Sequence, residues 1–146
     1  MAAIREWYSG YSIIYRWFEN KFGEDDLYEY WHYIAREVYQ ELAEKFREGG
    51  PTYIVSYFTE IILEDEGKLT VTADKDSVTV EILECPDHIW QTYYDQGYSI
   101  PNDNYYKSYE VIYGDVAEMA GYDFEMLKFD TQGRLKFRFS RREESL

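Results

Sequence analysis

The chain has few cysteines, histidines and basic residues. Its 146 residues include one cysteine and two histidines. A single cysteine, Cys85, excludes an internal disulfide and a cysteine-based zinc cluster. Fifteen Lys and Arg residues stand against 29 Asp and Glu residues, which gives a net charge of -14. Binding to nucleic-acid phosphates or to an anionic membrane surface needs clustered basic side chains, so this balance argues against both partners.

Long uncharged stretches are also missing. The first residues lack the basic and then apolar pattern of a signal peptide, and no uncharged run approaches the length of a membrane span. The single thiol suits a reducing compartment. We therefore expect a soluble, cytoplasmic protein. The length is that of one ordinary domain, so residues 1–146 should form a single domain with one core.

Tyrosine, in contrast, is abundant, with 17 residues in the chain. A tyrosine side chain combines a large apolar ring with a hydroxyl group that needs a hydrogen-bond partner. An excess of this residue suits half-buried places such as pocket walls, subunit contacts and sheet faces. The alternative is an ordinary spread of tyrosines over core and rim.

Apolar residues recur at helical spacing in the first part of the chain. The pattern predicts helices over residues 4–22, 24–48 and 51–62, separated by Gly23 and by Gly49-Gly50. The third segment is rich in β-branched residues, so a strand is the competing interpretation there. The first helix should be amphipathic, with Trp7, Tyr11, Ile14, Phe18 and Phe22 at helical spacing. In the second helix we expect a buried stripe, formed by Leu27, Trp31, Ile34, Val38, Leu42 and Phe46.

Two later segments alternate apolar and polar residues with period two. Residues 68–82 predict a hairpin that turns at 74–77, with Val78, Val80 and Ile82 facing inward. Residues 122–141 predict a second hairpin that turns at 130–133. Both hairpins should contribute to the same sheet.

Two helices are predicted between the hairpins. One starts at Pro86 and ends near Gly97, and the other starts after Asp103 and ends at Gly121. The fold class is therefore α+β, in which N-terminal helices precede two β-hairpins that form a four-stranded antiparallel sheet packed against helices.

Cys85 and His88 are the candidate catalytic residues. A thiol at the start of a helix lies near unpaired backbone N–H groups and the positive end of the helix dipole, which stabilise a thiolate. His88 follows three positions later, so the two side chains could meet across the first turn as a nucleophile and its base. The alternative is an inert core cysteine, with His88 facing water.

The helices after Cys85 are rich in aromatic residues. If both pack on one sheet face, their rings would line a cavity for a planar, amphipathic small molecule, and the candidate ligand-binding residues are Trp90, Tyr93, Tyr105 and Tyr109. The alternative is that these rings form the helix–sheet core or a dimer interface.

Metal and cofactor motifs give little signal. Glu29 and His32 have the spacing of a di-iron ligand pair, but a second copy of the motif is missing. We therefore expect His32 to be a hydrogen-bonded histidine near the surface, and we predict no metal. Phosphate-binding and dinucleotide-binding motifs are absent from the sequence, so no cofactor is predicted.

The order of elements, with Cys85-Pro86 after the first hairpin and the Gly-Tyr-Asp-Phe-Glu sequence at 121–125, resembles the L-2-amino-thiazoline-4-carboxylic acid hydrolase-like family over residues 31–139. The resemblance implies a small-molecule domain with hydrolase-like activity on a cyclic amidine-like carboxylate. Relatives often carry further cysteines at positions corresponding to 104–106 and 135–137, which hold none here. Of the cysteines found in such relatives, only Cys85 has a counterpart here, so the resemblance does not imply chemistry that needs several thiols.

Two functional hypotheses follow. The first is a small-molecule-binding domain with a pocket near Cys85, for which a hydrolase-like reaction is left open. The second is a homodimeric protein-interaction module without catalytic activity, which would use tyrosine-rich faces. Its supporting feature is a basic C-terminal strand on an acidic body, formed by Arg134, Lys136, Arg138, Arg141 and Arg142.

Overall fold

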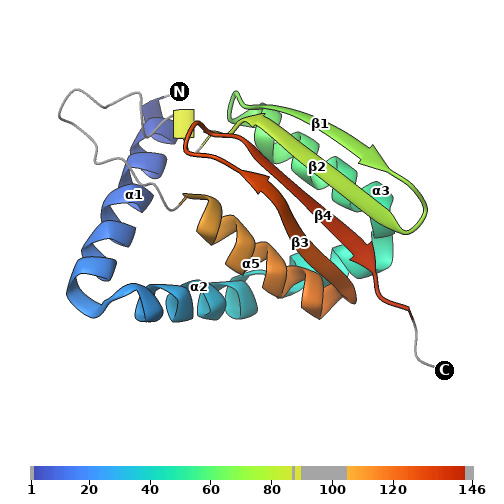
Figure 1. The fold of residues 1–146 in the computed structure, drawn as a ribbon, viewed down its shortest axis with the longest axis horizontal. Helices are drawn as coiled ribbons and strands as arrows, with labels where there is room; N and C mark the ends of the chain where they lie inside the picture. The colour runs from blue at the N-terminus through green and yellow to red at the C-terminus, as the bar shows by residue number, and fades with distance from the viewer. Residues whose placement is uncertain (1, 87, 90–104, 144–146) are drawn as a thin grey trace.

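The computed structural model describes residues 2–86, 88–89 and 105–143. Within them the chain forms helices and strands in an order that confirms the predicted α+β class (Figure 1). The elements are α1 (Ala2–Phe22), α2 (Glu24–Val38), α3 (Gln40–Glu64), β1 (Lys68–Ala73), β2 (Ser77–Glu84), α5 (Tyr105–Ala120), β3 (Tyr122–Phe129) and β4 (Leu135–Arg141).

The four strands form one antiparallel sheet in the order β1-β2-β4-β3. Each predicted hairpin is present, and β2 pairs with β4 to join them. Val80 lies opposite Phe137 in this central pair, and both side chains are buried. Glu81 and Lys136 alternate with them on the other face, where their charged groups lie 3.6 Å apart. The period-two pattern therefore separates a buried face from a polar one.

Aromatic rings join the sheet to the helices. Phe58 of α3 is fully buried, and its ring centroid lies 5.1 Å from that of Phe137 and 5.7 Å from that of Phe139 in β4. On its other side, Phe58 lies 5.0 Å from the ring of Tyr113 in α5. One phenylalanine thus connects α3, α5 and the sheet.

The predicted helix over residues 24–48 is wrong in one respect, because it is divided at Tyr39. This residue has φ -102° and ψ 14°, and α2 ends just before it. The predicted break near Gly50 is confirmed, since Gly50 has φ 66° and ψ -158° inside α3 and separates its two halves by a kink. The second half is helical, so the strand alternative for residues 51–62 is excluded.

Helix α1 stands to one side of the sheet and packs against α2 (Figure 1). Two aromatic contacts join these helices: the ring of Tyr15 lies 5.2 Å from Trp31, and that of Phe18 lies 5.3 Å from Tyr30. This contact covers only part of α1, and Trp7, Ile14 and Phe22 of its apolar side are exposed by half or more. In α2 the expected burial of Val38 is wrong, because this side chain is exposed.

Among the described residues, no helix combines the length and the apolar character that crossing a membrane requires.

Candidate functional site

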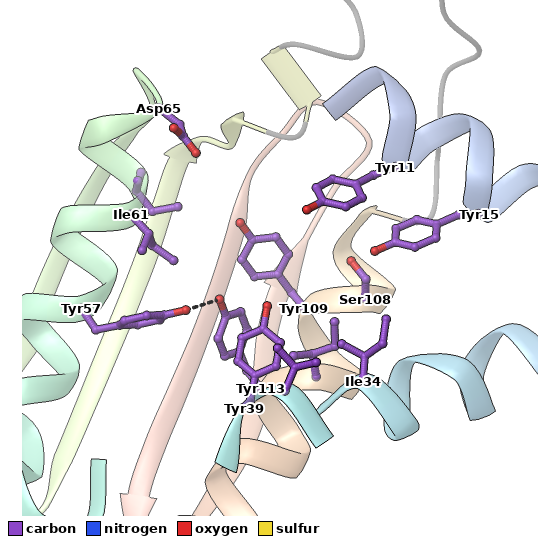
Figure 2. A pocket seen from close by; sticks show the side chains of 13 residues that line it. Tyr11, Tyr15, Ile34, Tyr39, Tyr57, Ile61, Asp65, Ser108, Tyr109 and Tyr113 are labelled. Carbon is purple, nitrogen blue, oxygen red and sulfur yellow. Dashed lines mark hydrogen bonds between the residues drawn. The ribbon is translucent and has the colours of Figure 1, made fainter. Parts of the chain in front are cut away.

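A cavity of about 380 Å³ lies between the N-terminal helices and α5 (Figure 2). Six of its described lining residues are tyrosines, and most of the others are aliphatic. Its size is in the range of small-molecule sites. The lining consists of Tyr11, Tyr15, Ile34, Val38, Tyr39, Tyr57, Ile61, Ile62, Asp65, Ser108, Tyr109, Ile112 and Tyr113.

Two pairs of tyrosines at a spacing of four residues form opposite walls. Tyr11 and Tyr15 belong to α1, and Tyr109 and Tyr113 belong to α5. Residues four apart lie on the same face of a helix, so each pair presents two rings to the cavity. Figure 2 shows Tyr11 and Tyr15 reaching from α1 toward Ser108 and the α5 tyrosines. The cavity is therefore bounded by phenol groups from both ends of the chain.

The hydroxyl groups of Tyr57 and Tyr113 meet at 3.0 Å across the gap between α3 and α5 (Figure 2). Either oxygen can be the donor. Burial raises the pKa of Tyr57 well above its ordinary value, and the hydrogen bond to Tyr113 opposes part of this shift. Tyr57 consequently stays neutral at physiological pH and can both donate and accept a hydrogen bond.

Asp65 is the only carboxylate among the described lining residues. It is the C-cap of α3, immediately after Glu64. Ile61 and Ile62, from the last turn of the same helix, also line the cavity. The negative end of the α3 dipole therefore lies at this wall, beside a negatively charged side chain.

Cys85 lies behind the wall, not on it. Its side chain is fully buried, and its thiol donates a hydrogen bond to the Tyr109 hydroxyl, with the sulfur 3.8 Å from the oxygen. Its backbone N–H donates to the carbonyl oxygen of Gly133 at 2.9 Å. Cys85 thus contacts a lining residue from the core side.

His88 packs against the turn between β3 and β4. A Cβ atom at Gly133 would lie 3.0 Å from the Cβ, Cγ and Nδ1 atoms of His88, so the ring covers this glycine closely. Pro86, His88 and Ile89 have helical backbone, and the Ile89 N–H donates to the Cys85 carbonyl at 3.0 Å. This supports the prediction that Pro86 starts a helix, the rest of which lies outside the described residues.

The remaining predicted ligand-binding residues are placed as follows. Tyr109 lines the cavity. Trp90 and Tyr93 lie outside the described residues, and so does the side chain of Tyr105, whose backbone begins α5. The sequence predicts a cavity between the sheet and the helices after Cys85. The described cavity is formed by α5 together with the N-terminal helices, whose tyrosines are not among the residues predicted for the site.

A histidine–aspartate pair, outside the cavity lining, links α2 to α5. His32 Nδ1 lies 2.6 Å from Asp115 Oδ2, and Arg36 Nε lies 3.8 Å from the same oxygen. Asp115 is buried, whereas the His32 side chain is 42% exposed. As the sequence predicts, His32 is a hydrogen-bonded residue near the surface. In the described part of the chain, no group of three His, Cys, Asp or Glu residues is arranged to hold a metal ion.

Comparison of the chain with models of protein families, with characterised proteins and with solved structures gives no match. The resemblance to the L-2-amino-thiazoline-4-carboxylic acid hydrolase-like family therefore stays a prediction.

Proposed function

We propose that the protein binds a small, partly aromatic molecule in the tyrosine-lined cavity. The observation that carries this proposal is the cavity itself, which is about 380 Å³ in volume and whose described lining includes six tyrosines from four separate segments of the chain. Flat rings with polar edges suit a planar ligand that has one or two polar groups, because the rings stack on its faces and the hydroxyls bond its edge.

The position of Cys85 favours binding over thiol catalysis. A nucleophilic thiol has to reach the substrate, but Cys85 is fully buried and contacts the Tyr109 hydroxyl from behind. Its contribution in this proposal is to hold Tyr109 in position. The Cys85 thiol of the folded protein should therefore react with a water-soluble disulfide reagent only as fast as the protein unfolds. Rapid labelling without unfolding would instead support a reactive thiol.

A fragment screen with two matched variants tests the binding site. Ile61→Trp places a large side chain at a lining position of α3 and should abolish binding by filling the cavity. Leu63→Trp adds the same side chain two residues away, where the leucine is exposed and outside the lining, and should leave binding unchanged. Planar phenols, amides and amines are titrated by NMR against all three proteins, and circular dichroism confirms that each is folded.

Compounds that bind the wild type and Leu63→Trp but not Ile61→Trp would locate the site. Fragments that bind Ile61→Trp as well as the wild type would show that they bind elsewhere, and the proposal would fail.

Homodimer formation is a second candidate function, favoured by the exposed apolar surface of α1. Ile13, Ile14 and Trp17 are about half exposed, and Trp7 is exposed by 64%. Sequence charge makes α1 the least acidic of the N-terminal helices, with three basic against two acidic side chains in a chain of net charge -14. Two copies would therefore repel each other least along α1, where one stripe can pair with itself about a two-fold axis.

Light scattering across a range of salt concentrations tests the dimer. Added salt screens the repulsion between two acidic chains, so the dimer fraction should rise with ionic strength. Trp17→Glu should give a monomer, whereas the same change at exposed Tyr33 of α2 should not. A wild-type protein that is monomeric at high salt and high concentration would exclude this candidate.

A further inference from the structure

The charged groups in the described lining of the cavity have one sign. Its described lining holds one carboxylate, Asp65, and no Lys, Arg or His side chain. The other polar groups are Ser108 and the tyrosine hydroxyls. Aromatic rings carry partial negative charge on their faces, so a positive group is attracted both by the rings and by the carboxylate.

The negative groups are concentrated at the end of α3. Figure 2 shows Asp65 at the end of this helix, beyond Ile61 on the same wall. Because the C-terminal end of a helix carries a partial negative charge, the dipole of α3 adds to the charge of Asp65 at this wall. The net charge of -14 contributes a long-range field of the same sign, which raises the local concentration of cations.

An anionic ligand would meet the opposite conditions. It would lose water without gaining a basic partner from the described lining. Burial also disfavours a negative charge at this wall, because it raises the pKa of Tyr57. An uncharged aromatic ligand would fill the space, but it would gain no charge interaction with Asp65. Only a cation gains from both the rings and the carboxylate.

We propose that the cavity recognises a small organic cation, whose alkylated ammonium group lies against the tyrosine rings and near Asp65. This inference rests on the proposed binding function and specifies the class of ligand. A cavity of about 380 Å³ has room for such a group and a short tail. The lining also includes the Ser108 hydroxyl and the hydrogen-bonded Tyr57–Tyr113 pair, whose oxygen atoms can accept a hydrogen bond from a polar group of the tail.

Three probes of nearly the same shape separate charge from size. Choline carries a trimethylammonium group, 3,3-dimethyl-1-butanol replaces the nitrogen with carbon, and 3,3-dimethylbutanoate replaces the alcohol with a carboxylate. Titrations followed by NMR on the tyrosine signals should show choline binding roughly tenfold more tightly than the alcohol, with no binding of the butanoate.

Two neighbouring carboxylates provide the matched variants. Asp65→Asn removes the lining charge and should weaken choline binding by about tenfold, while the alcohol binds as before. Glu64→Gln removes the same charge from the adjacent, exposed position outside the lining and should change the choline affinity little. Equal losses in the two variants would mean that only the overall field acts, and the assignment of Asp65 as the contact would be refuted.

The outcomes separate the ligand class from the binding function. If choline binds no better than the alcohol, or if uncharged fragments bind while choline does not, the cavity binds ligands but the cation inference fails. Preferential binding of the butanoate would also refute it and would favour the carboxylate ligand that the family resemblance implies. If neither the probes nor the fragment library bind at this cavity, the proposed function itself fails.

Discussion

The buried hydroxyl of Tyr57 makes the stability of the protein sensitive to alkaline pH. Burial raises the pKa of Tyr57 above its ordinary value of 10.0. The folded protein therefore keeps this proton at a pH where the unfolded chain has lost it. Below pH 10 the group has the same charge in both states, and its stabilising contribution is fully present. As pH rises above 10 toward the higher folded pKa, that contribution is lost, so the free energy of unfolding falls.

The size of the effect follows from proton linkage. A difference of one bound proton between the folded and unfolded states changes the free energy of unfolding by about 1.4 kcal/mol per pH unit. Between pH 9 and pH 11.5, Tyr57 alone should lower it by about 2 kcal/mol. Replacing Tyr57 by Phe removes this term, together with the hydrogen bond to Tyr113, which contributes about 1 kcal/mol.

Urea unfolding of the wild type and Tyr57→Phe at a series of pH values measures the difference. The wild type should be more stable by about 1 kcal/mol at pH 8, and the variant should be more stable by a similar amount at pH 11.5. Lysines and the tyrosines outside this pair titrate in both proteins, so the difference between the two curves reports on Tyr57 and its hydrogen bond to Tyr113. Tyr33→Phe serves as the control, because it removes an exposed hydroxyl. Parallel stability curves for the wild type and Tyr57→Phe would refute the assignment of a buried, neutral phenol.

Three further predictions concern the framework of the cavity, each measured by urea unfolding. Phe58→Ala should lower the free energy of unfolding by about 3–5 kcal/mol because it removes a fully buried ring, and a loss below about 1 kcal/mol would contradict the packing. A double-mutant cycle of His32→Gln and Asp115→Asn should give a coupling of about 1–2 kcal/mol, whereas additive effects would mean that the pair does not hold α2 to α5. Gly133→Ala should cost about 1 kcal/mol or more, since φ is +86° there and the new Cβ would meet His88; a neutral effect would contradict both features.

The strands could be predicted from sequence to within a few residues because a half-buried strand has a simple pattern. In β4, Leu135, Phe137 and Phe139 are buried and alternate with basic residues on the polar face. The neighbouring strand β2 shows the same alternation of buried and less buried residues. The positions of the hairpin turns could be predicted from their aspartate and glycine residues. The pairing of β2 with β4 could not be predicted, because several strand orders bury the same residues.

The break between α2 and α3 has no comparable sequence pattern. No glycine or proline adjoins Tyr39 in the sequence, and the Tyr39 N–H still donates to the carbonyl oxygen of Ala35 at 3.2 Å. Its φ and ψ angles can be adopted by any residue, so the local sequence does not require a turn. The turn directs α2 along α5 while α3 runs under the sheet, and the Tyr39 ring packs 6.3 Å from that of Tyr113. Tertiary contacts therefore determine this break.

The candidate site also depends on tertiary contacts that the local sequence does not reveal. The sequence pattern places Cys85 at a helix start, where an exposed, reactive thiol and a buried, inert one look alike. The difference comes from Gly133 and Tyr109, which are distant in sequence and contact Cys85 in the folded chain. The spacing of Tyr11 and Tyr15 similarly predicts a shared helix face, but not that this face lies opposite α5 across a cavity.

Tyrosine side chains suit the wall of an open cavity better than aliphatic ones. Aliphatic side chains on α1 and α5 could pack together and close it, because apolar surfaces gain by contact. A tyrosine ring supplies apolar surface for the neighbouring helices, but its hydroxyl loses free energy if it is buried without a partner. The Tyr57 and Tyr113 hydroxyls form a hydrogen bond across the gap between α3 and α5, so each has a partner within the cavity lining. The chain has 17 tyrosines, and six of those that the structure describes line this half-polar cavity.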